Sequence, residues 1–80
     1  MDKTGGRKPV AGYNQFLKLV RRGKALKVYL AADADGFFIR SVKAELQGKD
    51  IEFDESHTSK QLAEMAGVEV PTAVITETCG

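Results

Sequence analysis

One short apolar run, residues 27–32, constrains the fold of this chain more than any other feature of its sequence. It reads Lys-Val-Tyr-Leu-Ala-Ala and stops at Asp33. Because apolar residues fill consecutive positions instead of alternating with polar ones, the run is typical of a central strand that is buried on both faces. Such a strand needs helices on both sides of its sheet, so the sequence predicts an α/β domain.

Three segments with helical periodicity alternate with β-branched runs along the chain. The first helix is predicted over residues 13–22, and the second follows a turn at residues 33–36 that also supplies an N-cap. The third begins at Thr58, which forms a capping box with Gln61. The apolar stripes of the three helices are Phe16, Leu17 and Val20; Phe38, Ile39, Val42 and Leu46; and Leu62, Met65 and Ala66, and the closing glycines are Gly23, Gly48 and Gly67.

Further strands complete the expected sheet. Residues 8–11 read as a short edge strand, a position that tolerates Pro9 because an edge strand can lack one ladder hydrogen bond. Two more strands are expected at residues 51–53 and 72–76, and Pro71 makes the segment before the last one a loop. The strand and helix order predicts a three-layer α/β/α sandwich around a four-stranded mixed sheet.

The composition fits one small domain. With 80 residues, of which 42% are hydrophobic and 29% charged, the chain can bury a single core, so residues 1–80 are expected to form one domain with residues 1–7 as a flexible lead-in. No apolar run approaches the roughly 18 residues of a membrane span, and the first ten residues lack the apolar segment of a secretory signal. The sequence therefore predicts a cytoplasmic protein that does not contact a membrane.

Catalytic and metal chemistry find little support in the sequence. The chain has one cysteine, Cys79, and one histidine, His57, which leaves no internal disulfide and no cysteine-based zinc site. Asp33 and Asp35 are better explained by a turn and an N-cap than by a metal or acid pair. We therefore expect no enzyme activity, no cofactor and no small-molecule substrate.

Charge is distributed unevenly along the chain. Residues 1–30 hold eight Lys/Arg against Asp2 alone and so carry +7, whereas the remaining four Lys/Arg face ten acids and give −6. Such a split is typical of a protein with one surface that faces a polyanion, because the electrostatic steering of a ligand depends on the local field more than on net charge. Solvated helix faces explain the same distribution equally well.

A candidate recognition motif lies at the start of the first predicted helix. Asn14 and Lys18 are four residues apart and share one helical face, with Gln15 beside them, while the apolar residues point to the core. Gly12 allows a ligand to approach the free N–H groups of a helix start. The amides suit base edges, and Lys18 suits a guanine oxygen or a phosphate. The alternative is that Asn14 only caps the helix and Lys18 is solvated.

From residue 8 onward the sequence resembles the ribosomal protein L7Ae family, whose members bind kink-turn RNA in ribosomes and other ribonucleoproteins. The family reads Gly-x-Asn-Glu-x-x-Lys-x-x-x-x-Gly where this chain has residues 12–23. Several ordered matches make the resemblance more specific than one motif. The matching segments are residues 12–25, residues 28–35 and residues 62–71.

The resemblance implies the sandwich fold and a set of RNA contacts. The helix start at Gly12 would enter the groove at tandem sheared G·A pairs, where Asn14, Gln15 and Lys18 meet guanine edges. A loop, together with Ile39, would pack against an extruded nucleotide. Independently of the resemblance, Lys60 is either a contact to the RNA backbone or a solvated lysine, and Arg21 would add general attraction to RNA. The loop residues are Val68, Glu69, Val70 and Pro71. The implied partner is a kink-turn RNA, in ribosomal RNA or another ribonucleoprotein.

Three features depart from the family pattern. Gln15 stands in place of the usual Glu and lacks the charge that accepts from guanine N–H groups. The customary Leu-Gly of the third helix is Leu62-Ala63, and Glu64 replaces a common Lys or Arg. The short first helix is more like the bacterial members. A protein-interaction module on the same scaffold remains the alternative function, since fold alone does not fix function.

Overall fold

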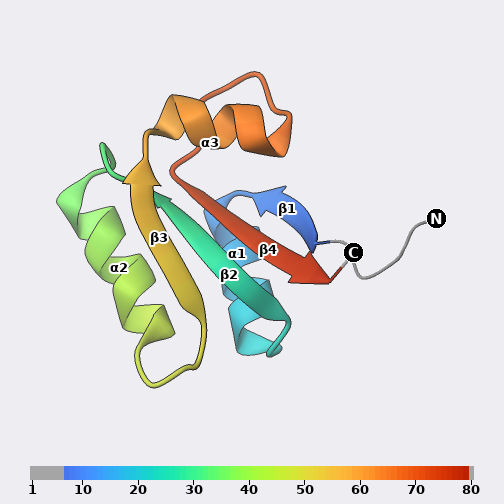
Figure 1. Cartoon of the computed structure of the whole chain (residues 1–80). Coiled ribbons are helices and arrows are strands. Elements are labelled where there is room, and N and C mark those ends of the chain that lie inside the picture. The colour runs from blue at the N-terminus through green and yellow to red at the C-terminus, as the bar shows by residue number, and fades with distance from the viewer. Residues whose placement is uncertain (1–6, 80) are drawn as a thin grey trace.

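The computed structural model describes residues 7–79, and within them strands and helices alternate throughout. Residues 1–6 of the expected lead-in lie outside the described part of the chain, and Arg7 already belongs to the first strand. The elements are β1 (Arg7–Ala11), α1 (Tyr13–Arg21), β2 (Ala25–Ala31), α2 (Gly36–Leu46), β3 (Glu52–His57), α3 (Ser59–Ala66) and β4 (Val74–Cys79). Figure 1 shows them as one sheet flanked by helices.

The sheet has four strands in the order β1-β4-β2-β3. β4 runs antiparallel to both of its neighbours, β1 and β2, whereas β3 runs parallel to β2. The sheet is therefore mixed, as predicted. β2 lies in its interior and β1 lies at an edge, which confirms the positions expected for the central apolar run and for the strand that contains Pro9.

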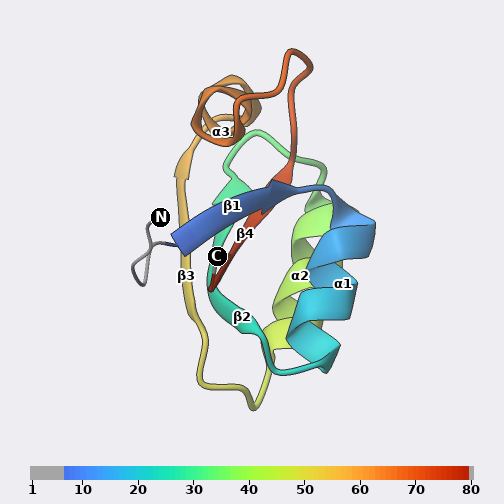
Figure 2. The same ribbon diagram turned by 90° about the vertical axis from the view of Figure 1, so that its right-hand side faces the viewer.

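Side-chain alternation along β2 divides the core between the two faces of the sheet. Val28 and Leu30 belong to a cluster with residues of α1 and α2, whereas Ala31 packs with Leu62 of α3 and Ile75 of β4. Figure 2 shows the sheet nearly edge-on, with α1 and α2 on one side and α3 on the other. This arrangement confirms the three-layer α/β/α sandwich. Within residues 7–79, no helix has both the length and the apolar character of a membrane crossing.

Side-chain caps mark where α2 and α3 begin. The Asp35 side chain accepts a hydrogen bond from the Phe37 N–H and caps α2, and Thr58 with Gln61 forms the expected capping box at α3. Gly67 closes α3 in the left-handed conformation. α1 ends at Arg21, one residue before its expected end, because Arg22 is already its C-cap.

Several expected boundaries were wrong. β3 spans Glu52–His57 and not residues 51–53. Residues 54–57 are polar, so no apolar pattern predicts a strand there, but they continue the pairing with β2 at the edge of the sheet. β4 spans Val74–Cys79 and not residues 72–76, because the Thr72 N–H bonds to Ser59 instead of a strand. β2 likewise covers Ala25–Ala31 and not residues 27–32. Met65 was expected in the buried stripe of α3 but is 39% exposed, and Ala63 is buried instead.

Thr76 is a polar residue inside the apolar core. It is fully buried, and its hydroxyl oxygen has no hydrogen-bond partner among residues 7–79. A buried hydroxyl without a partner has lost its hydration and gained nothing in exchange. We expect Thr76→Val to raise the free energy of unfolding by about 1 kcal/mol, measured by urea denaturation.

The matched control is Thr78→Val on the same strand. The Thr78 hydroxyl donates a hydrogen bond of 2.9 Å to the Lys24 carbonyl oxygen, so its removal should lower the stability. Equal effects of the two substitutions would show that the missing partner of Thr76 has no energetic consequence.

Candidate nucleic-acid interface

Three segments far apart in the sequence meet at one end of the sheet. They are residues 12–18 at the start of α1, residues 32–35 between β2 and α2, and residues 67–73 between α3 and β4, and we call them the candidate interface. The Gly12 N–H donates to the Val74 carbonyl at 3.2 Å, and the Ala31 N–H donates to the Ala73 carbonyl at 2.8 Å. Figure 2 shows all three segments at the end of the sheet where α1 begins.

Asp33 ties two of these segments together through α3. Its carboxylate accepts hydrogen bonds from the Ser59 N–H at 2.9 Å and from the Ser59 hydroxyl at 3.2 Å. The Ser59 carbonyl in turn accepts from the Thr72 N–H at 3.3 Å. The sequence predicted only a turn role for Asp33, and the structure adds this contact across 26 residues. No cluster of three or more potential metal ligands occurs among the described residues.

The start of α1 carries no side-chain cap within residues 7–79. The N-cap is Gly12, with φ of 108° and ψ of 147°, and it has no side chain that could accept from the first-turn N–H groups. Asn14 therefore does not cap the helix, whereas the second half of the alternative, a solvated Lys18, stays open. A helix start without a side-chain cap leaves N–H groups available to an anionic ligand.

The predicted trio lies on the surface at this helix start. Asn14, Gln15 and Lys18 are all exposed, and within residues 7–79 their side chains form no hydrogen bond or ion pair. Below them, Phe16 is fully buried, and Tyr13 lies 5.8 Å from Phe16 between ring centroids. The buried face fixes the helix, so the polar groups project from a rigid support.

A hollow of about 330 Å³ lies between α3 and the loop that follows it. It brings Lys60 of α3 together with Val68, Glu69 and Pro71 of the loop that the resemblance assigns to RNA contact. Val70 of the same loop is 68% exposed. Glu64 also lines the hollow, so one cation faces two carboxylates there.

Two of the expected site residues lie apart from this group. Arg21 lies at the far end of α1, about 10 Å along the axis from Asn14, and forms a 3.3 Å ion pair with Glu45. The hydrogen bond and the charge of Glu45 raise the pKa of the Arg21 guanidinium. Ile39 is half-buried against the core of α1 and α2. The structure thus brings neither side chain fully to the candidate interface.

Sequence reasoning missed Ser59 and Thr72, which connect the segments of the candidate interface. Both act through backbone groups, and Ser59 acts on a carboxylate distant in the sequence. A local motif carries no signal for such contacts. Phe37, next to Phe38 of the predicted apolar stripe, is 77% exposed.

The sequence and the fold of this chain match those of known proteins. The model of the ribosomal protein L7Ae/L30e/S12e/Gadd45 family matches residues 3–79. RNA-binding protein TTE2299 of Caldanaerobacter subterraneus subsp. tengcongensis is 33% identical over 73 residues, which cover 91% of this chain and 89% of that protein.

Two solved structures share the fold. A 15.5kD RNA binding protein of Giardia lamblia superposes with a TM-score of 0.80 at 30% identity, over 91% of this chain and 62% of that one. This chain thus spans less than two thirds of the Giardia protein. A Bacillus halodurans protein of unknown function gives a TM-score of 0.79 at 20% identity, over 89% of this chain and 71% of that one.

The positive φ of Gly12 generates a prediction about the start of α1. A Cβ at residue 12 would meet no atom within 4 Å, so any cost of Gly12→Ala must come from the backbone. We expect the substitution to lower the free energy of unfolding by about 1–3 kcal/mol, measured by chemical denaturation.

Gly36→Ala is the matched control, because residue 36 has equally open space and no positive φ. Alanine at this helical position should be neutral or stabilising by up to about 1 kcal/mol. A Gly12→Ala variant as stable as the Gly36→Ala variant would contradict the strained backbone at the helix start.

Proposed function

The chain belongs to the ribosomal protein L7Ae/L30e/S12e/Gadd45 family, and from this premise we propose that it binds RNA at kink-turns by reading tandem sheared G·A pairs. The names of two relatives, the Caldanaerobacter and Giardia proteins, describe RNA binding. The family is not one of enzymes, so no catalytic role is assigned. The physiological RNA would lie in a ribosome or another ribonucleoprotein of the cytoplasm.

The observation that carries the proposal is the exposed trio at the start of α1. Amide groups of Asn14 and Gln15 offer donors and acceptors to base edges, and Lys18 offers a donor to guanine O6 or N7. None of the three side chains has a competing hydrogen-bond partner within residues 7–79. Proteins read RNA where irregular pairs expose these edges, since the major groove of a regular A-form helix is too narrow.

The loop after α3 supplies a different kind of contact. Val68 is 38% exposed and Val70 is 68% exposed, so the loop presents apolar surface to solvent. An extruded nucleotide would cover this surface, with Lys60 beside it near the phosphates. Glu69 and Pro71 would complete the loop contact. Ile39 would contribute only the part of its side chain that the core leaves open.

The proposal predicts a strong preference for the sheared pairs. A short duplex with a kink-turn should bind about 100-fold more tightly than the same duplex with Watson–Crick pairs in place of the G·A tandem. Both dissociation constants are measured by gel shift at one fixed salt concentration, because phosphate contacts depend strongly on salt. Equal affinities would favour the alternative, a protein-interaction module on this scaffold.

Substitution of the trio tests the site directly. Asn14→Ala combined with Lys18→Ala should weaken kink-turn binding about 100-fold, because each base-edge contact contributes about 1–3 kcal/mol of discrimination. Both residues are exposed, so circular dichroism should show an unchanged fold.

Lys49→Ala is the matched control, since Lys49 is an exposed lysine in the turn after α2. Its loss should change the affinity less than about threefold, as expected for one solvated charge. A double variant that binds as tightly as the Lys49→Ala variant would disprove the role of the α1 start.

A further inference from the structure

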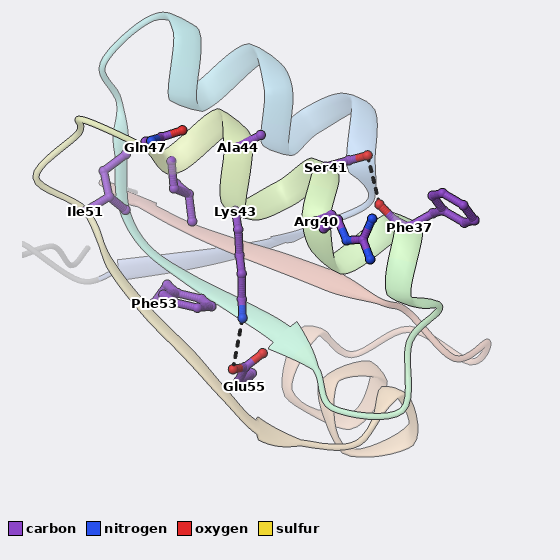
Figure 3. A pocket seen from close by; sticks show the side chains of 10 residues that line it. Phe37, Arg40, Ser41, Lys43, Ala44, Gln47, Ile51, Phe53 and Glu55 are labelled. Atoms are coloured by element: carbon purple, nitrogen blue, oxygen red, sulfur yellow. Dashed lines mark hydrogen bonds and ion pairs between the residues drawn. The ribbon is translucent and has the colours of Figure 1, made fainter.

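A second and larger hollow lies outside the candidate interface. It runs between α2 and the edge strand β3 and has a volume of about 900 Å³, within the range of small-ligand sites. We call it the α2–β3 groove, and Figure 3 shows the side chains along it. The residues that carry the argument are Phe37, Arg40, Lys43, Ile51, Phe53 and Glu55.

Two aromatic rings in this groove are open to solvent. Phe37 is 77% exposed in the first turn of α2, and Phe53 is 40% exposed on β3. Neither residue belongs to the core clusters of the described chain, although Phe38, next to Phe37, packs against one of them. Burial therefore accounts for Phe38 but gives no reason for a ring at residue 37.

A cation accompanies each exposed ring. The guanidinium carbon of Arg40 lies 5.9 Å from the centre of the Phe37 ring, and the Lys43 ammonium lies 5.6 Å from the centre of the Phe53 ring. Both cations come from α2 (Figure 3). Aromatic rings with cations along one groove are the elements with which proteins hold single-stranded nucleic acid, since bases stack on rings and phosphates lie near cations.

We propose that the α2–β3 groove binds unpaired nucleotides of the same RNA, with bases on Phe37 and Phe53 and phosphates at Arg40 and Lys43. The proposal rests on the proposed RNA-binding function. The position of the groove supports the proposal, because the groove begins at Phe37, two residues after the 32–35 segment of the candidate interface. α2 extends the groove for about 15 Å, enough for a few stacked nucleotides at ~3.4 Å each.

The charges of the groove fit this occupant. Lys43 forms a 3.4 Å ion pair with Glu55, and both side chains are nearly half exposed. Exposed ion pairs contribute little net stability, so a phosphate can replace Glu55 as the partner of Lys43 at small cost. Arg40 has no ion-pair partner within residues 7–79, so its charge is free to meet a second phosphate.

The test is a titration of the isotope-labelled full chain with an oligouridine of about eight nucleotides, followed by backbone amide NMR. This probe contains no G·A pair, so its binding does not depend on kink-turn recognition. We expect shift changes along α2 and β3 at the groove. Phe37→Ala should weaken oligouridine binding at least about fivefold, because one stacked base contributes about 1–3 kcal/mol.

Two further variants make the outcome specific. Leu26→Ala is the matched control, since Leu26 is a 41% exposed apolar residue that does not line the groove, and it should leave oligouridine binding unchanged. Arg40→Gln keeps the ring of Phe37 and should weaken binding while reducing its salt dependence. Phe37 is exposed, so its truncation should not affect folding.

Three results would overturn the proposal. The first is shift changes confined to the α1 start and the loop after α3. The second is a Phe37→Ala variant that binds oligouridine as the Leu26→Ala variant does. The third is shifts at β3 that depend on protein concentration without RNA, which would assign the groove to a second copy of the chain. A chain that discriminates G·A pairs but leaves the groove unshifted would retain the proposed function and lose only this inference.

Discussion

The burial of β2 on both faces is the constraint on which the rest of the structure depends. Val28 and Leu30 are fully buried on the face of α1 and α2, and Ala31 is fully buried on the face of α3. Since neither face can be left open to water, the helices must lie on opposite sides of the sheet. The chain then returns repeatedly to the end of the sheet where β2 stops, and the candidate interface is assembled from those returns.

Hydrogen bonds at this end of the sheet hold the three segments of the candidate interface in a defined arrangement. Asp33 is an exposed carboxylate that caps α3 from another segment, and Thr72 binds the same residue of α3 through its backbone. Gly12 is joined to β4 in a similar way. A recognition surface made from three segments requires such ties, because a loop without them would lose its geometry to conformational entropy.

The sequence predicted the elements whose signals are local and missed those whose causes are distant. The core stripe of α1, the capping box of α3 and the central position of β2 follow from spacing and side-chain type, and the structure confirms them. The length of β3 depends on pairing with β2, and the pairing of Arg21 with Glu45 depends on how α1 packs against α2. The motif identified the trio of Asn14, Gln15 and Lys18, but only the structure showed that Gly12, and not Asn14, is the N-cap of α1.

The exposed rings of the α2–β3 groove would favour association of the protein with itself, and the adjacent cations oppose it. In a chain of 80 residues, open apolar rings beside an unpaired strand edge would favour edge-to-edge association. Arg40 and Lys43 lie over these rings, and the Lys43–Glu55 ion pair places charges of both signs across the groove. Charged groups at an edge oppose association with another strand, whereas a polyanion with stacking bases satisfies both the cations and the rings. Arg40 and Lys43 thus oppose association of the free protein, and the same two side chains favour a ligand that offers both phosphates and stacking bases.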